Sequence, residues 1–472
     1  MLKRTNLPSL SVIIPTYNEA KRIQESLPTL CSYLVTAGIN AEVIVVNDPG
    51  DDNTAQVVTK FSKSNTKPRV ILFQTGIRLG KGGSIRVGAE KACGDIVLFL
   101  DADLPTDLSN IRRFYEGVRN GADCVYGRRL GNRIYNKQPL IRHILSKAFH
   151  FLVLILFRLD YDTQCGFKCA RRPVALEIFE HVSLDRLAYD VDFVVEARKR
   201  GYSVREFEIT WYYHSLSSIR VVKAATRMFL DVLAIWFKNL FPEPSLTENQ
   251  AEIARFYDNV RGDVRYRATR SMFLPRRLWY TGKYGMATGE ALRYAQSSSL
   301  NLKSVKVLDV GFGSGNVLEK LVSLGFEEPV GIELSKSSVL FVAKRSRHAV
   351  PIRADGRNLP LSSGTFDCVL CIDLLEHLKQ PQECLGEILR VLKENGLAIV
   401  STPNASLRWH FIFAFWPRMR REKLEIHHTA IGRNRLIYLM KCSGFNIEKT
   451  SSVNLGLLTF VAARKGSSSP PS

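Results

Sequence analysis

The sequence contains no apolar stretch long enough to cross a lipid bilayer. A spanning helix needs about 20 predominantly apolar residues, whereas the longest apolar window, residues 148–157, has ten residues and includes His150. The first eight residues carry Lys3 and Arg4, but a strand pattern follows them instead of the apolar core of a secretory signal. We therefore expect neither a membrane-spanning helix nor a signal peptide, and we expect a cytoplasmic location.

Cysteine and acidic residues are also scarce. The nine cysteines are scattered and odd in number, which is typical of reduced thiols in the cytosol. Cys165 and Cys169 have no second pair at the spacing of a zinc site. The 66 basic residues outnumber the 45 acidic ones and give a net charge of +21, which favours anionic partners such as nucleotide phosphates or an acidic membrane surface. No nucleic-acid recognition motif is present, so nucleic acid is not predicted as a partner.

The sequence does contain two successive series of alternating strand and helix patterns. Short apolar runs begin near Ser11, Glu42, Val70 and Val97, and a new series begins at Val305. Alternation of this length predicts parallel, doubly wound sheets, so the predicted fold class is α/β with two tandem Rossmann-like domains. The predicted divisions are a first domain at 1–242, a linker with a helical lead-in or lid segment at 243–300, a second domain at 301–465 and a disordered tail at 466–472.

The first candidate site follows the apolar run Val97–Leu100. Asp101 and Asp103 stand one residue apart where this strand ends, and Pro105 stops it. Ligands of open α/β sheets bind at the carboxyl ends of strands, and paired carboxylates suit Mg²⁺ or Mn²⁺, which in turn holds a diphosphate. Asp48 ends another strand of the same series, so the three carboxylates are expected to converge. Taken alone, the acidic pair is better read as two solvated loop residues, and the surrounding motifs reverse that preference.

A glycine-rich segment with a lysine, Gly80–Ser84, lies between these strands. It differs from the ATP-binding P-loop because position 75 is Thr where that motif needs Gly, and because Gly follows Lys81 where it needs Ser or Thr. ATP binding is therefore rejected. A glycine-rich helix start that carries Lys81 can still contact a diphosphate.

Six motifs of the first half stand in a definite order along the chain. They are Ser11–Glu19, Val45–Thr54, Gly80–Gly88, Asp101–Pro105, Gly127–Arg129 and Asp162–Lys168. This ordered set resembles the inverting GT-A glycosyltransferases over residues 8–240. The last motif is most similar to dolichyl-phosphate glucosyltransferases, and dolichyl-phosphate mannose synthases come next.

This resemblance implies a nucleotide-sugar donor, with UDP-glucose as the expected one, and a divalent metal. Asp48 is expected on the uracil or ribose, Asp103 on the metal, and Asp101 beside it on the ribose or on the metal and its waters. Asn47 and Pro49 stand where the family usually has Asp and Gly, which implies altered nucleotide contacts. The other implied residues are Pro15, Tyr17 and Glu19 for donor binding and Lys81, Arg129 and Lys168 for the phosphates.

A further acidic pair, Asp190 and Asp192, stands where related enzymes carry one. If the acceptor is a phosphate, it is already ionised at pH 7, so a strong general base is not required. Two interpretations stay open. The pair acts as a base, or it only positions the acceptor or pairs with Arg198 or Lys199.

Two segments of the first half have the pattern of helices that lie on a membrane surface. Val222–Phe241 has apolar residues at helical spacing, and His143–Leu159 is the second candidate. An interfacial helix on an anionic membrane and an ordinary core-facing helix are both open. The first interpretation predicts a peripheral protein on the cytoplasmic face. The charged side of the first segment consists of Lys223, Arg227, Asp231 and Lys238.

The second series begins with Val305–Gly315, in which a strand runs into glycines at alternate positions. Backbone without side chains approaches a ligand closely at a helix start. The spacing Gly-x-Gly-x-Gly differs from the dinucleotide motif Gly-x-Gly-x-x-Gly, so NAD is only the second choice. Glu333 ends the next strand, where its carboxylate is placed to bind a ribose diol, and Arg353–Gly356 and Phe366–Asp373 follow.

This second set resembles class I S-adenosylmethionine-dependent methyltransferases over residues 301–465. Asp373, Glu376 and His377 are implied near the point of methyl transfer, with Asp373 assigned to the cofactor. His377 is either a base or only a residue that starts a helix. The residues implied for the cofactor are Asp309, Gly311, Gly313 and Gly315 around its methionine end, Glu333 on the ribose and Asp355 at the adenine amine.

The acceptor region of this second domain is expected after its fifth strand. An aromatic stretch, residues 409–416, precedes a basic stretch, residues 418–423, and His427 and His428 are weaker base candidates. The aromatic and basic stretches suit either a lipid headgroup zone or a lid packed on its own domain.

Together these patterns predict a bifunctional enzyme. The first domain transfers a hexose, with inversion, from a nucleotide sugar to a polyprenyl phosphate. The second transfers a methyl group from S-adenosylmethionine to that product or a related glycolipid. Two alternatives stay open: a methyltransferase with a non-catalytic binding module, or transfer of the sugar to a soluble glycan or protein. The sequence predicts no oligomeric state.

Overall fold

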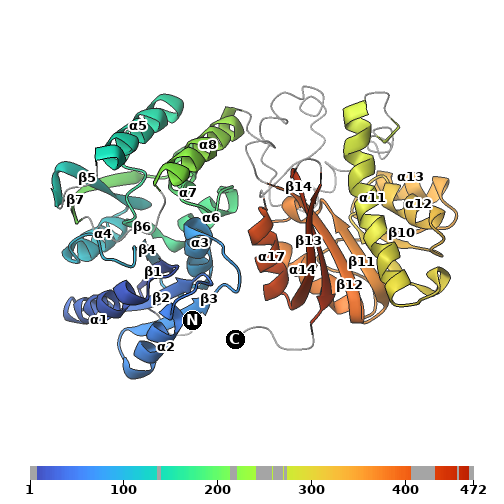
Figure 1. The fold of residues 1–472 in the computed structure, drawn as a ribbon, viewed down its shortest axis with the longest axis horizontal. Helices are drawn as coiled ribbons and strands as arrows, with labels where there is room; N and C mark the ends of the chain where they lie inside the picture. The colour runs from blue at the N-terminus through green and yellow to red at the C-terminus, as the bar shows by residue number, and fades with distance from the viewer. Residues whose placement is uncertain are drawn as a thin grey trace. The chain divides into compact units, whose positions relative to one another are not determined.

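The computed structural model describes residues 8–135, 140–212, 221–240, 258, 269–270, 274–404, 431–453 and 456–466. The chain divides into two compact units, Met1–Leu240 and Phe241–Ser472, which are described separately (Figure 1). Each unit contains one seven-stranded sheet with helices beside it. The predicted fold class of two tandem α/β domains is therefore confirmed.

The first unit is built on a mixed sheet in the order β3-β2-β1-β4-β6-β5-β7. β3, β2, β1 and β4 are parallel, β6 is antiparallel to β4 and β5, and β7 is parallel to β5. The segments that follow β1, β2 and β4 therefore emerge at one edge. The strands are β1 Leu10–Thr16, β2 Ala41–Asn47, β3 Arg69–Gln74, β4 Ile96–Phe99, β5 Cys124–Tyr135, β6 Lys168–Arg171 and β7 Val204–Tyr212.

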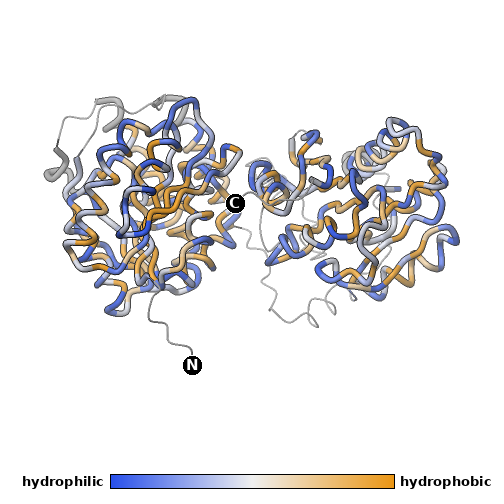
Figure 2. Tube along the Cα trace, turned by 90° about the horizontal axis from the view of Figure 1, so that it is seen from below, coloured by the Kyte–Doolittle hydropathy of each residue, from blue (hydrophilic) through white to orange (hydrophobic). Residues whose placement is uncertain are grey.

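Burial explains why these apolar runs become central strands. Every residue of β2 and β4 is buried, as expected for parallel strands whose two faces are both covered. Figure 2 accordingly shows apolar segments concentrated in the interior of this unit. Its helices are α1 Ala20–Thr36, α2 Thr54–Ser64, α3 Lys81–Lys91, α4 Ser109–Arg119, α5 Leu140–Phe157, α6 Arg172–His181, α7 Tyr189–Lys199 and α8 Val221–Leu240.

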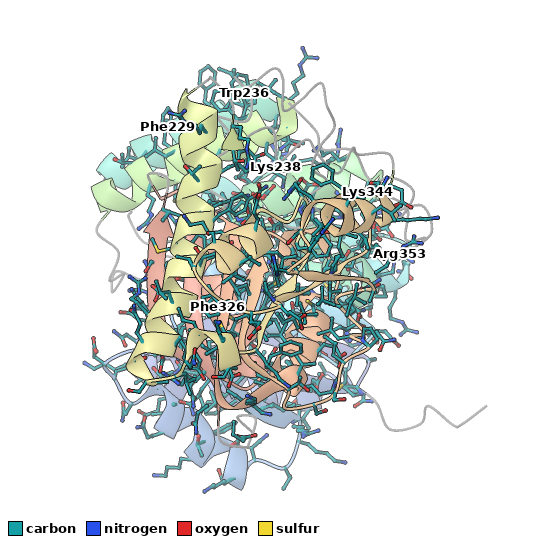
Figure 3. The ribbon with its side chains drawn as sticks, turned by 90° about the vertical axis from the view of Figure 1, so that its right-hand side faces the viewer. Phe229, Trp236, Lys238, Phe326, Lys344 and Arg353 are labelled. Carbon is teal, nitrogen blue, oxygen red and sulfur yellow. The ribbon has the colours of Figure 1, made fainter. Side chains whose placement is uncertain are left out.

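Helices α5 and α8, the two segments with an interfacial pattern, pack against each other (Figure 1). No helix among the described residues is long and apolar enough to cross a membrane. Lys238 and Trp236 lie on α8 with Phe229 (Figure 3). The large apolar side chains exposed on this helix pair are Phe151, Leu154, Ile155, Phe229, Leu230 and Leu240.

The second unit has the sheet order β10-β9-β8-β11-β12-β14-β13. The first five strands are parallel and β14 is antiparallel to both β12 and β13. The segments that follow β8, β9 and β11 consequently share an edge. The strands are β8 Val307–Val310, β9 Val330–Glu333, β10 Val350–Arg353, β11 Phe366–Ile372, β12 Leu392–Pro403, β13 Phe445–Val453 and β14 Leu458–Lys465.

Helix α11, Leu274–Ser297, lies within the region predicted as a helical lead-in or lid segment. Its buried residues Ala287, Ala291 and Tyr294 join a core cluster with Phe326 (Figure 3) and residues of β8, β11 and β12. α11 is therefore packed on the second sheet. The remaining helices are α12 Asn316–Ser323, α13 Lys336–Arg345, α14 Pro381–Val391, α17 Arg433–Cys442 and the short η1 Leu302–Ser304 and η2 Leu375–His377.

Candidate functional site

The carboxyl end of β4 carries an ion pair between the loop and helix α3. Lys81 Nζ lies 2.7 Å from Asp101 Oδ1, and a Cβ atom on Gly166 would fall 2.1 Å from Asp101 Oδ2. Position 166 therefore has no room for a side chain while Asp101 stays in place. Burial acts to lower the pKa of Lys81, but the charges of Asp101, Asp190 and Asp103 outweigh it and raise that pKa.

Asp103 and Glu19 complete an acidic cluster at this edge. The amide of Leu104 donates to Asp101 O at 3.2 Å, so the chain makes a tight turn directly after β4. Burial raises the pKa of Glu19, and the charges of Asp103 and Asp101 add to that shift although Arg22 opposes it. Within the described residues, no group of three His, Cys, Asp or Glu side chains forms a metal site by itself.

Asp48, which was expected to converge with this pair, is buried against the start of α3. Its carboxylate accepts hydrogen bonds from Gly80 N at 2.7 Å, Thr75 Oγ1 at 2.9 Å and Ser84 Oγ at 3.0 Å. Burial nevertheless raises its pKa. Asp48 thus fixes the helix whose first residue, Lys81, reaches Asp101.

The glycines of Gly80–Ser84 are explained by close packing. A Cβ on Gly82 would lie 2.5 Å from Tyr189 Cβ, and one on Gly80 would lie 2.9 Å from Asp185 O. The amide of Gly83 also donates to Asp185 O at 3.0 Å. These glycines let α3 lie against the segment before α7, which differs from the phosphate contact that the sequence suggested for them.

Lys168, which was expected to face a phosphate, is enclosed. It is 1% exposed, and its ammonium donates to Asp190 Oδ1 at 2.5 Å, to Thr163 O at 3.0 Å and to Cys165 O. Lys168 therefore acts on the site through Asp190, whose charge also raises the pKa of Lys81.

Asp190 and Asp192 point to different partners from the start of α7. Asp192 is fully buried and accepts hydrogen bonds from Ser183 N at 2.7 Å and Lys238 Nζ at 3.0 Å. Among the described residues neither acid pairs with Arg198 or Lys199, so that one of the open alternatives is not found. The partners are Lys168 and Lys238, which come from distant segments that local sequence spacing does not bring together.

Arg129 forms a bidentate ion pair with Asp162. Its Nε and its terminal nitrogen lie 2.7 Å from the two carboxylate oxygens, and its guanidinium stacks 5.2 Å from the Trp211 ring. Burial acts to raise the pKa of Asp162, but Arg129 outweighs it and lowers that pKa. The sequence assigned Arg129 to a phosphate without finding this partner.

The carboxyl end of β1 and the residue that follows it are held by contacts with β2 and with Arg78. Arg78 stacks 3.7 Å from the centre of the Tyr17 ring, and Pro15 lies in register with Val46 of β2. Asn47 Oδ1 accepts a hydrogen bond from Thr16 at 2.9 Å. The side chain of Asn47, which stands where the family usually has Asp, therefore accepts a hydrogen bond between β1 and β2.

In the second unit, the glycine loop has the backbone that its sequence predicts. Gly311, Gly313 and Gly315 all have positive φ, at 82°, 54° and 72°, a region that side chains disfavour. Glu333 accepts hydrogen bonds from Gly313 N at 2.8 Å and Ser335 N at 3.0 Å, which joins the ends of β8 and β9.

Asp309 is a buried acid beside this loop. It is 1% exposed, and its Oδ2 has no hydrogen-bond partner among the described residues. Burial raises the pKa of Asp309 to about 8, and the charge of Glu333 adds to the shift. A buried acceptor without a partner costs stability, so it fits a site that a ligand donor completes.

We expect Asp309 to make the second unit less stable as pH rises from 3.8 to about 8. Across this window the folded chain keeps a proton that the unfolded chain has lost, so the free energy of unfolding falls with pH. Asp309→Asn has no such proton and should show a weaker pH dependence. Thermal unfolding of both proteins from pH 4 to pH 9 measures the difference. Identical slopes would contradict the assignment.

Two other predicted residues are held by ion pairs. Asp355 binds Arg357 through both oxygens, at 3.1 and 2.7 Å. Asp373 has a positive φ of 54° and accepts hydrogen bonds from Ser401 Oγ at 2.8 Å and Lys283 Nζ at 2.6 Å. The Lys283 ammonium also lies near two aromatic rings, those of Tyr280 and Tyr284.

Lys283 is the residue of this site that sequence reasoning missed. Its side chain is 4% exposed, although it comes from a segment predicted to be a linker or lid. Only its helical spacing from Ala287 and Ala291 indicated burial. His377 is buried on η2 next to Glu376, and its role as base or helix-start residue stays a prediction.

Several predicted features lie outside the described residues. They are the aromatic and basic stretches at 409–416 and 418–423, His427, His428 and the tail from residue 467.

The first half of the chain is similar in sequence to known glycosyltransferases. The family described as "Glycosyl transferase family 2" matches residues 11–179. The dolichyl-phosphate beta-glucosyltransferase of Drosophila melanogaster is 31% identical over 245 residues, which are 49% of this chain and 75% of that protein. The chain belongs to glycosyl transferase family 2. The resemblance predicted for the first half is thereby confirmed.

The second half of this family 2 protein matches a different description, "Methyltransferase domain", over residues 308–400. The chain therefore carries a glycosyltransferase domain and a methyltransferase domain. Glycosyltransferase AglD of Haloferax volcanii is 30% identical over 252 residues, which are 52% of this chain but only 39% of that protein.

Two solved structures are similar to parts of the family 2 protein. One is glucosyl-3-phosphoglycerate synthase from Mycobacterium tuberculosis in complex with uridine diphosphate, at 14% identity, with 49% of this chain and 79% of that chain covered and a TM-score of 0.38. The other is magnesium protoporphyrin IX methyltransferase from Synechocystis PCC 6803, at 15% identity, with 46% and 100% covered and a TM-score of 0.36.

Proposed function

We propose that the chain is a bifunctional enzyme. Its first unit transfers a hexose, with UDP-glucose as the expected donor, to a polyprenyl phosphate with inversion. Its second unit transfers a methyl group from S-adenosylmethionine to that glycolipid or a related small molecule. The observation that carries the first proposal is the acidic edge after β4, together with the curated dolichyl-phosphate glucosyltransferases that match half of the chain.

The first site combines carboxylates for a metal with cations for phosphates. Mg²⁺ or Mn²⁺ would bind Asp101 and Asp103, and it would supply positive charge for the departing diphosphate. Lys81 already compensates one of these carboxylates at 2.7 Å. Such preorganised charge stabilises charge that develops in the transition state.

The contacts of the two acids on α7 favour a phosphate as the acceptor of the sugar. Asp190 and Asp192 are both engaged by lysines, and Asp192 is fully buried. A hydroxyl acceptor needs a group that removes its proton, whereas a phosphate is ionised at pH 7 and attacks without one. A phosphate acceptor therefore agrees best with these contacts.

The second site fits S-adenosylmethionine through its acids and its glycines. The left-handed glycines leave room for a ligand close to the backbone, and Asp309 Oδ2 offers a buried acceptor. Glu333 keeps lone pairs beyond its two backbone bonds, so a ribose hydroxyl can still bind it. The cofactor supplies the methyl group, and these residues orient it.

A panel of nucleotide sugars with polyprenyl phosphate tests the first activity. The full chain is incubated with each labelled donor, with and without S-adenosylmethionine, and products are analysed by mass spectrometry. We expect label in the organic extract and an added methyl only when S-adenosylmethionine is present. Label that stays in the aqueous phase would overturn the lipid acceptor, and no transfer from any donor would support a binding module.

We also propose that α5 and α8 bring this site to an anionic membrane surface. Their exposed apolar side chains and the net charge of +21 support peripheral binding. Phe151→Ser with Phe229→Ser should lower cosedimentation with anionic liposomes by about tenfold or more, since each phenylalanine loses apolar burial. Leu340→Ser with Val350→Ser removes exposed apolar side chains of the second unit and should change nothing. Equal losses in both variants would contradict the assignment.

A further inference from the structure

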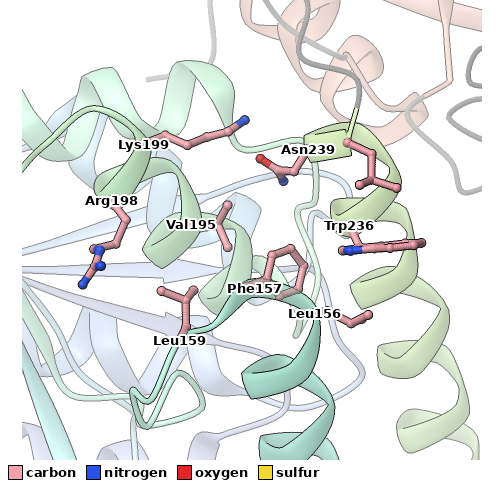
Figure 4. Close-up of a pocket in the computed structure, with 9 residues that line it drawn as sticks. Leu156, Phe157, Leu159, Val195, Arg198, Lys199, Trp236 and Asn239 are labelled. Carbon is pink, nitrogen blue, oxygen red and sulfur yellow. The ribbon is translucent and has the colours of Figure 1, made fainter.

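A hollow of about 430 Å³ lies on the first unit between the ends of α5, α7 and α8 (Figure 4). Its wall is largely apolar, with Phe157 from α5, Val195 from α7 and Trp236 from α8. Arg198 and Lys199, at the end of α7, also line it. The volume falls in the range of about 300–1,000 Å³ that is typical of ligand sites.

The two cations at this hollow are poorly compensated. Arg198 has no ion-pair partner among the described residues, and its guanidinium donates only to the Tyr161 hydroxyl at 3.0 Å. Lys199 lies 3.8 Å from Glu196, which Lys238 and Arg200 approach more closely, at 2.9 and 2.5 Å. Burial lowers the pKa of Lys199, and the charge of Lys238 lowers it further although Glu196 opposes this. The end of α7 therefore favours an anion.

This hollow is separate from the acidic edge of the same unit. Asp190, whose charge acts on Lys81 at that edge, is at the first turn of α7, and Arg198 is eight residues later. Eight residues of helix correspond to about 12 Å. Asp190 and Arg198 therefore stand at opposite ends of α7.

The surroundings of the hollow indicate what covers it. Two of the helices that line it, α5 and α8, also expose Phe151, Ile155, Phe229 and Leu230. An apolar hollow bordered by cations is complementary to a molecule with a hydrocarbon chain and an anionic headgroup. A membrane phospholipid combines these two features in one molecule.

We propose that this hollow is an accessory site for an anionic phospholipid. One hydrocarbon chain lies between α5, α7 and α8, and the headgroup phosphate binds Arg198 and Lys199. The bound lipid does not react. The site therefore does not depend on which acceptor receives the sugar, and it is tested without any transfer assay.

The test uses dihexanoyl phosphatidylglycerol below its critical micelle concentration, so that no membrane surface is present. Titration of the full chain is followed by calorimetry and by the fluorescence of Trp236, obtained as the difference from Trp236→Phe. We expect saturable binding of one lipid per chain. Dihexanoyl phosphatidylcholine, which has the same chains and no net charge, should bind about tenfold more weakly or worse, because it lacks the headgroup charge.

Charge variants make the test specific. Arg198→Gln with Lys199→Gln should reduce the affinity for the anionic lipid to that for the neutral one, whereas Arg198→Lys should retain it. Lys60→Gln with Lys63→Gln removes two exposed cations of α2 and should have no effect. If the double variant at α7 unfolds, Lys199→Gln alone should still weaken binding severalfold. Unsaturable binding, equal affinity for both lipids or no effect at α7 would overturn the proposal.

Discussion

Asp103→Ala is expected to lower hexose transfer by about 10²–10³-fold or more, the range for loss of one preorganised electrostatic contact at a reacting centre. The tight turn after β4 holds Asp103 beside Asp101, and its charge acts on both Glu19 and Lys81. Without it, a divalent ion loses one of two protein carboxylates. Radiolabelled sugar in the organic extract measures the effect.

Asp95→Ala is the matched control for this prediction. Asp95 directly precedes β4, at the opposite end from Asp103, and its side chain is exposed. It should keep full activity. The Asp103 variant should also retain the thermal stability of the wild type and its affinity for S-adenosylmethionine, because the second unit is untouched. Unchanged sugar transfer by Asp103→Ala would remove this edge from the mechanism.

Lys283→Met is expected to damage the methyltransferase unit and leave hexose transfer intact. The substitution keeps the length of the side chain but leaves Asp373 as a buried carboxylate without its cation. Loss of one partner of a buried ion pair costs about 3 kcal/mol or more of unfolding free energy. Affinity for S-adenosylmethionine should fall about tenfold or more, in line with loss of a residue that orients a ligand-binding group.

The reason for the affinity loss is the position of the loop after β11. Leu374, next to Asp373, packs at 3.1 Å from where a Cβ of Gly311 would be, so the loop lies against the glycine turn. Lys283 and Ser401 hold Asp373 in its left-handed conformation. Lys283 is therefore a positioning residue for the cofactor site.

Lys449→Met, on β13, provides a control that contacts the same helix. Lys449 pairs with Glu290 of α11 at 2.8 Å, but it is half exposed, and such pairs contribute less than about 1 kcal/mol. Binding of S-adenosylmethionine should be unchanged. The double variant Lys283→Met, Asp373→Asn should be more stable than Lys283→Met alone, because it leaves no unpaired charge. If Lys283→Met behaves like Lys449→Met, the buried pair has no role in the site.

Local sequence patterns predicted the fold because each central strand is an apolar run that ends in polar residues. β4 with Asp101 and β8 with the glycine loop are examples, and the segment after each of these inner strands lies at the carboxyl end of the parallel strands, as predicted. The same patterns pointed to Glu333, and the resemblance to methyltransferases pointed to Asp309. Predictions of this kind need only the neighbours of a residue in sequence and the direction of the parallel strands.

The partners of the site residues were not predictable in the same way. Lys168 meets Asp190 across 22 positions, Lys238 meets Asp192 across 46, and Lys283 meets Asp373 across 90. Each pair depends on how two distant elements pack, which periodicity does not encode. The packing of the glycines before α3 was not predictable for the same reason, because the segment that packs on them lies about a hundred residues later.

Crystals of the full chain soaked with Mn²⁺ and uridine diphosphate test the central claim most directly, which is that the carboxyl end of β4 binds the sugar donor. We expect the metal on Asp101 or Asp103 and the diphosphate within reach of Lys81. Binding of the nucleotide elsewhere, with this edge empty at saturating ligand, would contradict the claim.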